Sequence, residues 1–371
     1  MAPFDRRLIS HISWPLIIIA LLLFGLGVMN LYSASSLRVE TGVTTIFFYK
    51  KQLLWGAVGI AVMFASMLFD YRHLKSLVWI LYGLSVALLA WLLLFGETIF
   101  GAKRWISLHY FSFQPTELAK LSVLLLAAAY LSRFQDKLDW KRLIKIILLV
   151  LIPTAMIILQ PDLGSGLNIL LIVFGMILVK GLKRRVFITL LLLIPLLAPS
   201  GWFIMHDYQK ERILTFLNPE RDPLGSGYNI IQSQIAIGSG QMWGKGFLEG
   251  TQSQLRFLPE KHTDFVFAVF GEEWGFIGCL TLLTLFCLFL YQIVLITQDS
   301  KDQFGSFLAV GVFFYFFWQI LINMAMVLGL MPVVGIPLPF LSYGGSSTVV
   351  NFCLLGLVLN VSMRRFVFKR G

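Results

Sequence analysis

Asp264 is the side chain whose setting in the sequence best suits a general base. It follows the polar residues Glu260 to Thr263 and directly precedes an apolar run that begins at Phe265. A carboxylate at the edge of such a run is partly dehydrated, which raises its pKa toward the range in which a base works near neutral pH. The alternative is structural, because Thr263 or Asp264 could cap the helix that starts there.

Two basic side chains, Arg104 and Lys120, lie on either side of a helix start. Pro115 suits the first position of a helix, and Thr116 could cap it. Glu117 and Lys120 are three residues apart, so they share one helix face and can pair. We interpret Arg104 and Lys120 as a cationic pocket for an anionic headgroup. The alternative is a structural Glu117–Lys120 pair that lets the helix enter a membrane.

Two further segments combine helix-breaking residues with groups that can bind a phosphate. Pro161 ends one apolar run, and Asp162 follows at a position where it can cap the next helix, which is sufficient to explain it. Nearer the C-terminus, prolines and glycines interrupt the chain between residues 331 and 345. Free N–H groups at the following helix start, with Ser342 and Ser346, could bind a phosphate. The alternative is a tight re-entrant turn.

The elements that position these groups are long apolar helices. Of the 371 residues 58% are hydrophobic and 13% are charged, against about 25% charged in a soluble domain. The apolar runs approach the ~20 residues that span a bilayer as a helix, and they lack the alternation of barrel strands. The predicted fold is therefore all-α and polytopic, with one integral membrane domain over residues 1–371. The ten predicted transmembrane helices are 13–35, 48–69, 74–95, 116–132, 143–159, 163–180, 186–206, 265–296, 304–330 and 343–366.

Two adjacent carboxylates, Glu272 and Glu273, lie inside the predicted helix 265–296. They are two turns beyond Asp264, too deep for helix capping to explain them. An ionisable side chain in hydrocarbon costs several kcal/mol, so we expect both to pair with polar groups in the protein interior.

The distribution of basic residues predicts how the helices are oriented. Most of the 30 Lys and Arg residues fall in the termini and in the loops on the side of the N-terminus, and short basic loops stay in the cytoplasm. We therefore place both termini in the cytoplasm. This orientation puts the connections 96–116, 160–163, 207–264 and 331–343 on the outer side, so the predicted site faces outward.

The connection 207–264 is far longer than most loops, which suggests a function of its own. Within it Tyr228, Ile231 and Ile235 recur at helical spacing. They predict an amphipathic helix that lies either on the membrane surface or on the helix bundle.

Composition argues against several other classes of site. The net charge of +11 comes from short basic clusters between apolar runs, which does not indicate nucleic acid binding. The five histidines are dispersed, and the three cysteines lie in apolar segments without paired spacing. The sequence therefore predicts neither a metal site nor a disulfide framework.

Two sets of residues resemble the hallmarks of a known family, the SEDS proteins (shape, elongation, division and sporulation). The first set is Asn323, Gly329, Pro332, Gly335, Leu338–Ser342 and Gly344–Ser346; the second is Leu258–Glu260, His262–Phe265 and Gly271–Glu273. Phe113–Glu117 with Lys120, and Gln160–Asp162, match in order and spacing, so the resemblance covers nearly the whole chain. The segment Gly250–Leu255 resembles the RodA branch, which acts in elongation, more than the FtsW division branch or the sporulation branch. Trp274 stands where Leu is commoner, a minor departure.

The resemblance implies a peptidoglycan glycosyltransferase that joins lipid II units into glycan strands at the outer face of the bacterial cytoplasmic membrane. It implies that Asp264 takes the proton from the GlcNAc 4-hydroxyl of the acceptor lipid II. That oxygen attacks C1 of MurNAc on the donor and expels undecaprenyl diphosphate with inversion. The other implied roles are charge neutralisation at the diphosphate for Arg104 and Lys120, orientation of Lys120 for Glu117, sugar stacking for Trp105, and lining of the cavity for Asp162 and Ser342.

The resemblance also implies partners, chiefly a class B penicillin-binding protein, the transpeptidase, within an elongation complex. A divalent cation such as magnesium or manganese is compatible with the chemistry, although no residue set in the sequence requires one. Two other functions stay open. A lipid II flippase would need a path across the bilayer and would work with the outer carboxylate neutralised. A non-catalytic scaffold for the transpeptidase would need only its helical surface.

Overall fold

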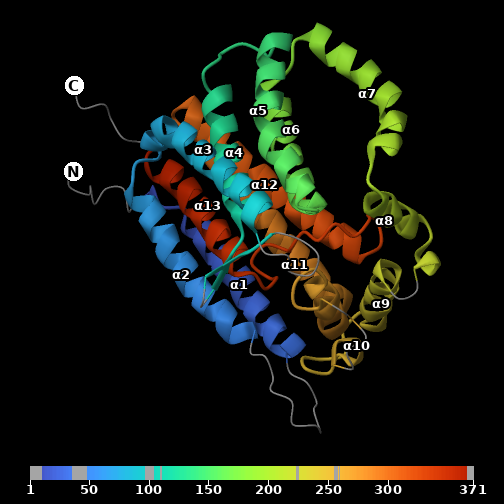
Figure 1. Ribbon diagram of the computed structural model, residues 1–371. Coiled ribbons are helices and arrows are strands. Elements are labelled where there is room, and N and C mark those ends of the chain that lie inside the picture. Colours follow the sequence, from blue (N-terminus) through green and yellow to red (C-terminus); the bar gives the residue numbers. More distant parts are fainter. Residues whose placement is uncertain are drawn as a thin grey trace.

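A computed structural model describes residues 11–35, 48–96, 104–108, 111–222, 225–254, 258 and 260–365. Within them all ten segments predicted to be apolar helices are helical (Figure 1). They are α1 (Trp14–Ser35), α2 (Phe48–Leu68), α3 (Tyr71–Phe95), α4 (Pro115–Leu131), α5 (Trp140–Leu159), α6 (Leu163–Lys180), α7 (Arg184–Ile204), α11 (Val266–Gln298), α12 (Gln303–Val327) and α13 (Gly345–Met363).

By length and composition, eight of the described helices can cross a membrane, which confirms a polytopic all-α membrane protein. The remaining two of the ten are α4, which has 17 residues and is almost entirely buried, and α7. Figure 1 shows α7 standing apart from the other helices. The central position of α4 explains why a helix with an acidic and a basic side chain is tolerated in an apolar bundle, since protein surrounds it.

Close packing of α13 against α2 forms one side of the core. Gly59 of α2 lies against Phe352 of α13, where an added Cβ would come within 2.6 Å of the ring. Small residues allow such approach between membrane helices. Phe340, in the segment before α13, packs against the rings of Phe289, Phe316 and Phe352. This aromatic cluster fixes the start of α13, and with it the loop that precedes it.

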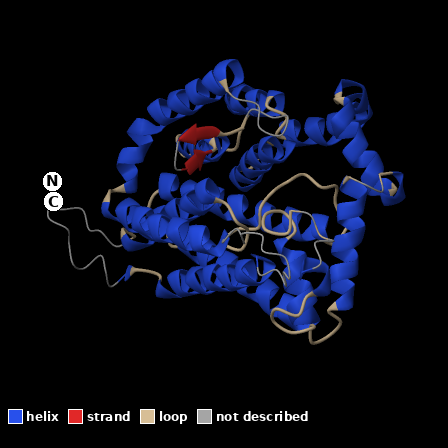
Figure 2. Cartoon of the chain, turned by 60° about the horizontal axis from the view of Figure 1, so that its bottom comes forward, coloured by secondary structure: helices blue, strands red, loops and turns tan. Residues whose placement is uncertain are grey.

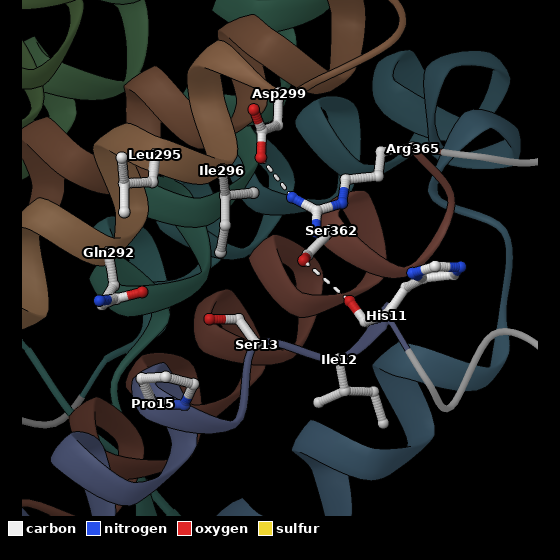
Figure 3. A pocket seen from close by; sticks show the side chains of 10 residues that line it. All are labelled: His11, Ile12, Ser13, Pro15, Gln292, Leu295, Ile296, Asp299, Ser362 and Arg365. Atoms are coloured by element: carbon white, nitrogen blue, oxygen red, sulfur yellow. Dashed lines mark hydrogen bonds and ion pairs between the residues drawn. The ribbon is translucent and has the colours of Figure 1, made fainter.

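The first and last described residues meet at one end of the bundle. The hydroxyl of Ser362 donates to the main-chain oxygen of His11 over 3.2 Å, and Arg365 pairs with Asp299 at the end of α11. Figure 3 shows these residues around a cavity of about 270 Å³. An even number of crossings, as predicted, brings both ends of a chain to the same side.

Shorter elements gather at the opposite end. They are β1 (Ile106–Leu108), β2 (Phe111–Phe113), α8 (Asp207–Leu217), the 3-10 turn η2 (Pro219–Arg221), α9 (Ser226–Ser239) and α10 (Thr251–Gln254). The two strands pair antiparallel with Ile106 opposite Phe113, an element that the sequence did not predict (Figure 2). The predicted helix in the long connection is confirmed as α9. Its buried face carries Ile230, Ser233 and Ala236, while Ile235 is 45% exposed.

The long helix α11 is broken at Gly275, whose φ is +63°. The segment after α9 supplies the hydrogen bonds that the break removes. The amides of Lys245 and Gly246 donate to the main-chain oxygens of Glu272 and Glu273, and the amide of Phe276 donates to Gln241 O. Unpaired main-chain groups are costly in an apolar setting, so this segment and the broken helix depend on one another.

Glu272 and Glu273 have interior polar partners, as predicted. The Glu272 carboxylate accepts from Lys245 Nζ over 2.7 Å and from Gln252 N over 2.9 Å. Ser33 of α1 donates to the Glu273 carboxylate. Both acidic side chains therefore join the loop and α1 to α11, close to the turn that carries Asp264.

Candidate functional site

The irregular segment 332–338, between α12 and α13, is the place where the candidate side chains converge. Its residues contact α8, α12 and the turn that carries Asp264. The main-chain oxygen of Val333 accepts from Arg212 of α8 over 2.8 Å, and that of Ile336 accepts from Asn323 of α12 over 2.8 Å. A Cβ on Gly335 would lie 3.5 Å from Asp264 Oδ2, so the carboxylate faces this glycine. The segment forms one wall of the site.

The main chain around Asp264 is fixed from two sides. Asn323 Nδ2 donates to the main-chain oxygen of Asp264 over 2.9 Å. Ser342 Oγ donates to the main-chain oxygen of Thr263 over 2.6 Å and accepts from the amide of Leu338 over 2.8 Å. Ser342 is 4% exposed. It therefore holds the turn that carries Asp264, and its lining of a substrate cavity stays a prediction.

The carboxylate of Asp264 does not cap α11. The helix begins at Val266, its N-cap is Phe265, and no side-chain hydrogen bond caps it. Within the described part of the chain the carboxylate forms no hydrogen bond, and its side chain is partly exposed. The structural alternative for Asp264 is thus removed, which leaves an acceptor that is free to take a proton.

The surroundings of Asp264 shift its affinity for protons. Burial raises its pKa to about 6, and the negative charges of Glu260 and Asp162 act in the same direction. The positive charges of Arg212 and Arg104 lower it, by less than burial raises it. A carboxylate with a pKa near 6 is ionised at neutral pH and is also a stronger base than an exposed one.

Arg104 and Asp162 lie at the start of α6, beside Asp264. The guanidinium of Arg104 donates from Nε to Gln160 O over 3.3 Å and from an Nη to Pro161 O. Asp162 accepts the amide of Ser165 over 3.1 Å, which confirms it as the N-cap of α6. Gln114 Nε2 lies 3.4 Å from its other oxygen. Arg104 thus binds the main chain of the connection between α5 and α6. Its positive charge also lowers the pKa of Asp264.

Glu117 and Lys120 form the ion pair that their spacing predicts, with Nζ and Oε1 2.5 Å apart. Both side chains are buried, with 2% of Lys120 and 3% of Glu117 exposed. The ammonium of Lys120 also lies over the ring of Tyr315, inside the bundle. The role of Lys120 at a headgroup stays a prediction.

Two other expectations about this end of the molecule are resolved. Thr116 does not cap α4, because the helix begins at Pro115 and its N-cap is Gln114. Ser346, expected at a phosphate, accepts from the amide of Gln114 over 3.2 Å and donates to Ser112 O over 3.4 Å. It therefore ties α13 to the β-hairpin.

Trp105 is partly exposed before β1, and its stacking on a sugar stays a prediction. Residues 97–103, 255–257 and 259 lie outside the described part.

Arg212 is one of the charged residues that act on Asp264, together with Glu260, Asp162 and Arg104, and the sequence did not single it out. It was one of several basic residues in the long connection, and nothing in its neighbours Glu211 and Ile213 marks it. The structure brings it to Asp264 through a contact between residues more than a hundred positions apart in the chain. Among the described residues no group of three His, Cys, Asp or Glu side chains could hold a metal ion.

Comparison with known proteins agrees with this fold. The family described as "Cell cycle protein", which covers FtsW, RodA and SpoVE, matches residues 13–366. Peptidoglycan glycosyltransferase MrdB of Escherichia coli K12 is 39% identical over 316 residues, 85% of each chain. A solved chain from a study of polymerization and crosslinking by a peptidoglycan synthase complex is 33% identical with a TM-score of 0.81, over 96% of this chain and 98% of that one. Rod shape determining protein RodA of Thermus thermophilus is 30% identical with a TM-score of 0.70, over 96% and 98%.

Proposed function

Because the chain belongs to the FtsW, RodA and SpoVE family of cell cycle proteins, the SEDS family, we propose that it is a peptidoglycan glycosyltransferase of the elongation type. Its substrate is lipid II, and its products are a glycan strand and undecaprenyl diphosphate. The observation that carries this assignment is the Asp264 carboxylate, which caps no helix and is partly exposed. It lies near two arginines, at the end of the bundle opposite the chain termini.

In the proposed reaction these groups have the following roles. Asp264 accepts the proton of the GlcNAc 4-hydroxyl on one substrate molecule, and the oxygen attacks C1 of MurNAc on the other. The bond between C1 and the diphosphate breaks with inversion, and negative charge grows on the leaving group. Cationic side chains near that charge stabilise the transition state more than the ground state. Arg104, whose guanidinium spans Gln160 and Pro161, is held in place to do this.

The remaining side chains support that geometry. We assign Ser342 and Asn323 to holding the turn of Asp264, and Asp162 to fixing the start of α6 beside Arg104. Trp105 offers a partly exposed indole for a sugar ring. A magnesium or manganese ion bound by the diphosphate would add to the charge neutralisation, without needing a ligand cluster in the protein.

We place the protein in the bacterial cytoplasmic membrane with the site on the outer face. The end that carries His11, Arg142, Lys180 and Arg365 is basic and has short loops, which favours the cytoplasmic side. The other end holds the long connection and Asp264, where lipid-linked sugars and a transpeptidase meet the enzyme. The partner that suits this position is a class B penicillin-binding protein.

Reconstitution distinguishes this function from the two alternatives. The purified protein, with its transpeptidase partner in liposomes, is given labelled lipid II, and polymer formation and lipid translocation are measured separately. We expect glycan strands longer than the disaccharide substrate. Translocation without polymer would indicate a flippase, and neither activity with an intact transpeptidase complex would indicate a scaffold.

The pH dependence of polymerisation should report the pKa of Asp264. The ionised carboxylate is the active form, so we expect kcat/KM to be level above pH 7 and to fall about tenfold per pH unit below pH 6. His262 is two residues away, but burial and Lys261 lower its pKa to about 4, so it does not titrate in this window. The measurement is initial rate against pH from 4.5 to 8. A flat profile through pH 6 would contradict the assignment of the base.

A further inference from the structure

Two connections, α4–α5 and α6–α7, are hydrogen-bonded to one another at the end of the bundle where α5 and α7 begin (Figure 1). The amide of Leu138 donates to Gly181 O over 3.0 Å, and the amide of Lys183 donates to Leu138 O over 3.0 Å. The aliphatic stem of Lys137 lies against Gly181, whose φ is +83°. Lys137 on one connection is therefore in contact with the other, two residues from Lys183.

Basic side chains are concentrated around this bridge. The two connections and the first turns of α5 and α7 contain six exposed basic residues, which we call the basic platform: Arg133, Lys137, Lys141, Lys183, Arg184 and Arg185. The acids of the same segments are Asp136 and Asp139, and Asp139 pairs with the less exposed Arg142 over 3.9 Å. Within the described chain none of the six platform residues forms an ion pair within 4.0 Å.

Basic residues beside other connections have acidic partners. Arg72 at the start of α3 lies 3.8 Å from Asp302, and Arg364 after α13 lies 3.6 Å from Asp70. The preference for basic cytoplasmic loops accounts for many lysines and arginines at this end of a membrane protein. It does not require six of them to be exposed and unpaired on two joined connections. The platform thus has positive charge available for a ligand.

Two further cations fix the platform in place. Lys180 Nζ donates to Phe134 O in the α4–α5 connection, and it lies 5.4 Å from the ring centre of Phe307 in α12. The guanidinium of Arg142 lies 4.3 Å from the ring centre of Phe134. The main chain of the platform is therefore held before any ligand arrives, and binding has to order only the exposed side chains.

Exposed apolar side chains continue from the platform along α5 and α7. Ile144, Leu148 and Leu151 share one face of α5 and are 50%, 58% and 43% exposed. Phe187 and Leu191 of α7 are 49% and 60% exposed. A phospholipid has the matching order of groups, with an anionic phosphate above its acyl chains. An acidic soluble protein would match the basic part of this surface but not the apolar part.

We propose that the basic platform binds the phosphate groups of anionic phospholipids, with Lys137 and Lys183 at its centre. The acyl chains of the bound lipid lie along the exposed faces of α5 and α7. Basic clusters beside membrane-crossing helices attract anionic lipid, and each Lys or Arg near the surface strengthens binding about fivefold. Lysine suits this position because its aliphatic stem can lie along apolar surface while its ammonium reaches the headgroup. This lipid site is separate from the chemistry at Asp264.

The affinities for two lipids that differ in headgroup charge test the proposal. The purified full-length protein in neutral detergent is titrated with phosphatidylglycerol and with zwitterionic phosphatidylcholine of the same acyl chains, and bound lipid is measured by native mass spectrometry. We expect wild-type protein to prefer phosphatidylglycerol. Lys137→Gln with Lys183→Gln should reduce the ratio of the two affinities about 10- to 30-fold, since two charges are lost. Lys137→Arg with Lys183→Arg should keep the ratio, because both charges remain.

Lys75→Gln with Lys301→Gln is the matched control. Both are exposed lysines, in α3 and in the connection between α11 and α12, and their replacement removes the same net charge. We expect the wild-type ratio and an unchanged Tm. An equal fall in the two glutamine variants would show a diffuse effect of net charge and would overturn the proposal, as would equal affinity of the wild type for the two lipids. Tighter binding of soluble poly-glutamate than of phosphatidylglycerol would also overturn it, in favour of an acidic protein partner.

Discussion

Replacing Asp264 with asparagine is expected to lower the rate of glycan polymerisation by about 10²–10⁴-fold, the usual contribution of a general base. The amide has the shape of the carboxylate but cannot accept the proton of the sugar hydroxyl. The attacking oxygen would then remain protonated as the bond to C1 forms. The measurement is the single-turnover rate of polymer formation from labelled lipid II with the transpeptidase partner present.

The substitution should leave the fold intact, so a loss of rate can be assigned to chemistry. Asn323 binds the main-chain oxygen of residue 264, and Ser342 binds that of Thr263, neither of which depends on the carboxylate. The side chain caps no helix. Removing a partly buried carboxylate whose pKa burial has raised should even favour folding slightly at neutral pH, because a desolvated charge disappears.

Asp207→Asn is the matched control for this variant. It makes the same chemical change in the same connection, at the start of α8, and its side chain is fully exposed. We expect a wild-type rate and wild-type thermal stability. Polymerisation by a stably inserted Asp264→Asn protein at the wild-type rate would remove Asp264 from the role of base, and Glu260 would become the next carboxylate to examine.

Local sequence was sufficient for the parts of this molecule that depend on neighbours along the chain. Apolar run length alone predicted the ten long helices, because a membrane-crossing helix satisfies its own main chain. The N-cap at Asp162 and the pair of Glu117 with Lys120 involve residues three apart, so their spacing was enough. The position of Asp264 at the end of an apolar run was likewise visible before any tertiary contact was known.

Features that arise from long-range contacts could not be predicted in this way. The packed face of α9 is set by Val327, which accepts from Ser233, and no pattern within α9 reveals it. The break at Gly275 is stable only because the segment around Lys245 replaces its lost hydrogen bonds. Arg212 comes close to Asp264 through its contact with Val333, and Glu117 and Tyr315 enclose the ammonium of Lys120. Charge alone could not predict either set of contacts.

The buried pair of Glu117 and Lys120 carries the second large expected effect, on stability. Glu117 lies 3.5 Å from the hydroxyl of Tyr315, which also bonds Asn351 of α13 at 2.9 Å. Removing one partner leaves an uncompensated charge among α4, α12 and α13. We therefore expect either Glu117→Gln or Lys120→Met to destabilise the protein by about 3–5 kcal/mol. The measurement is the apparent Tm of the purified protein in detergent.

The double variant Glu117→Gln with Lys120→Met decides whether the cost comes from the unpaired charge. It leaves no isolated ion in the core, so it should be more stable than either single variant, whereas independent contributions would make it the least stable of the three. Asp207 and Lys210 provide the control, an acid and a lysine at the same spacing but 4.0 Å apart, with Asp207 fully exposed and Lys210 partly exposed. Their neutralisation should change the Tm little, since exposed pairs contribute only about 0–1 kcal/mol. A double variant that polymerises lipid II at the wild-type rate would remove Lys120 and Glu117 from the reaction and leave them a role in stability alone.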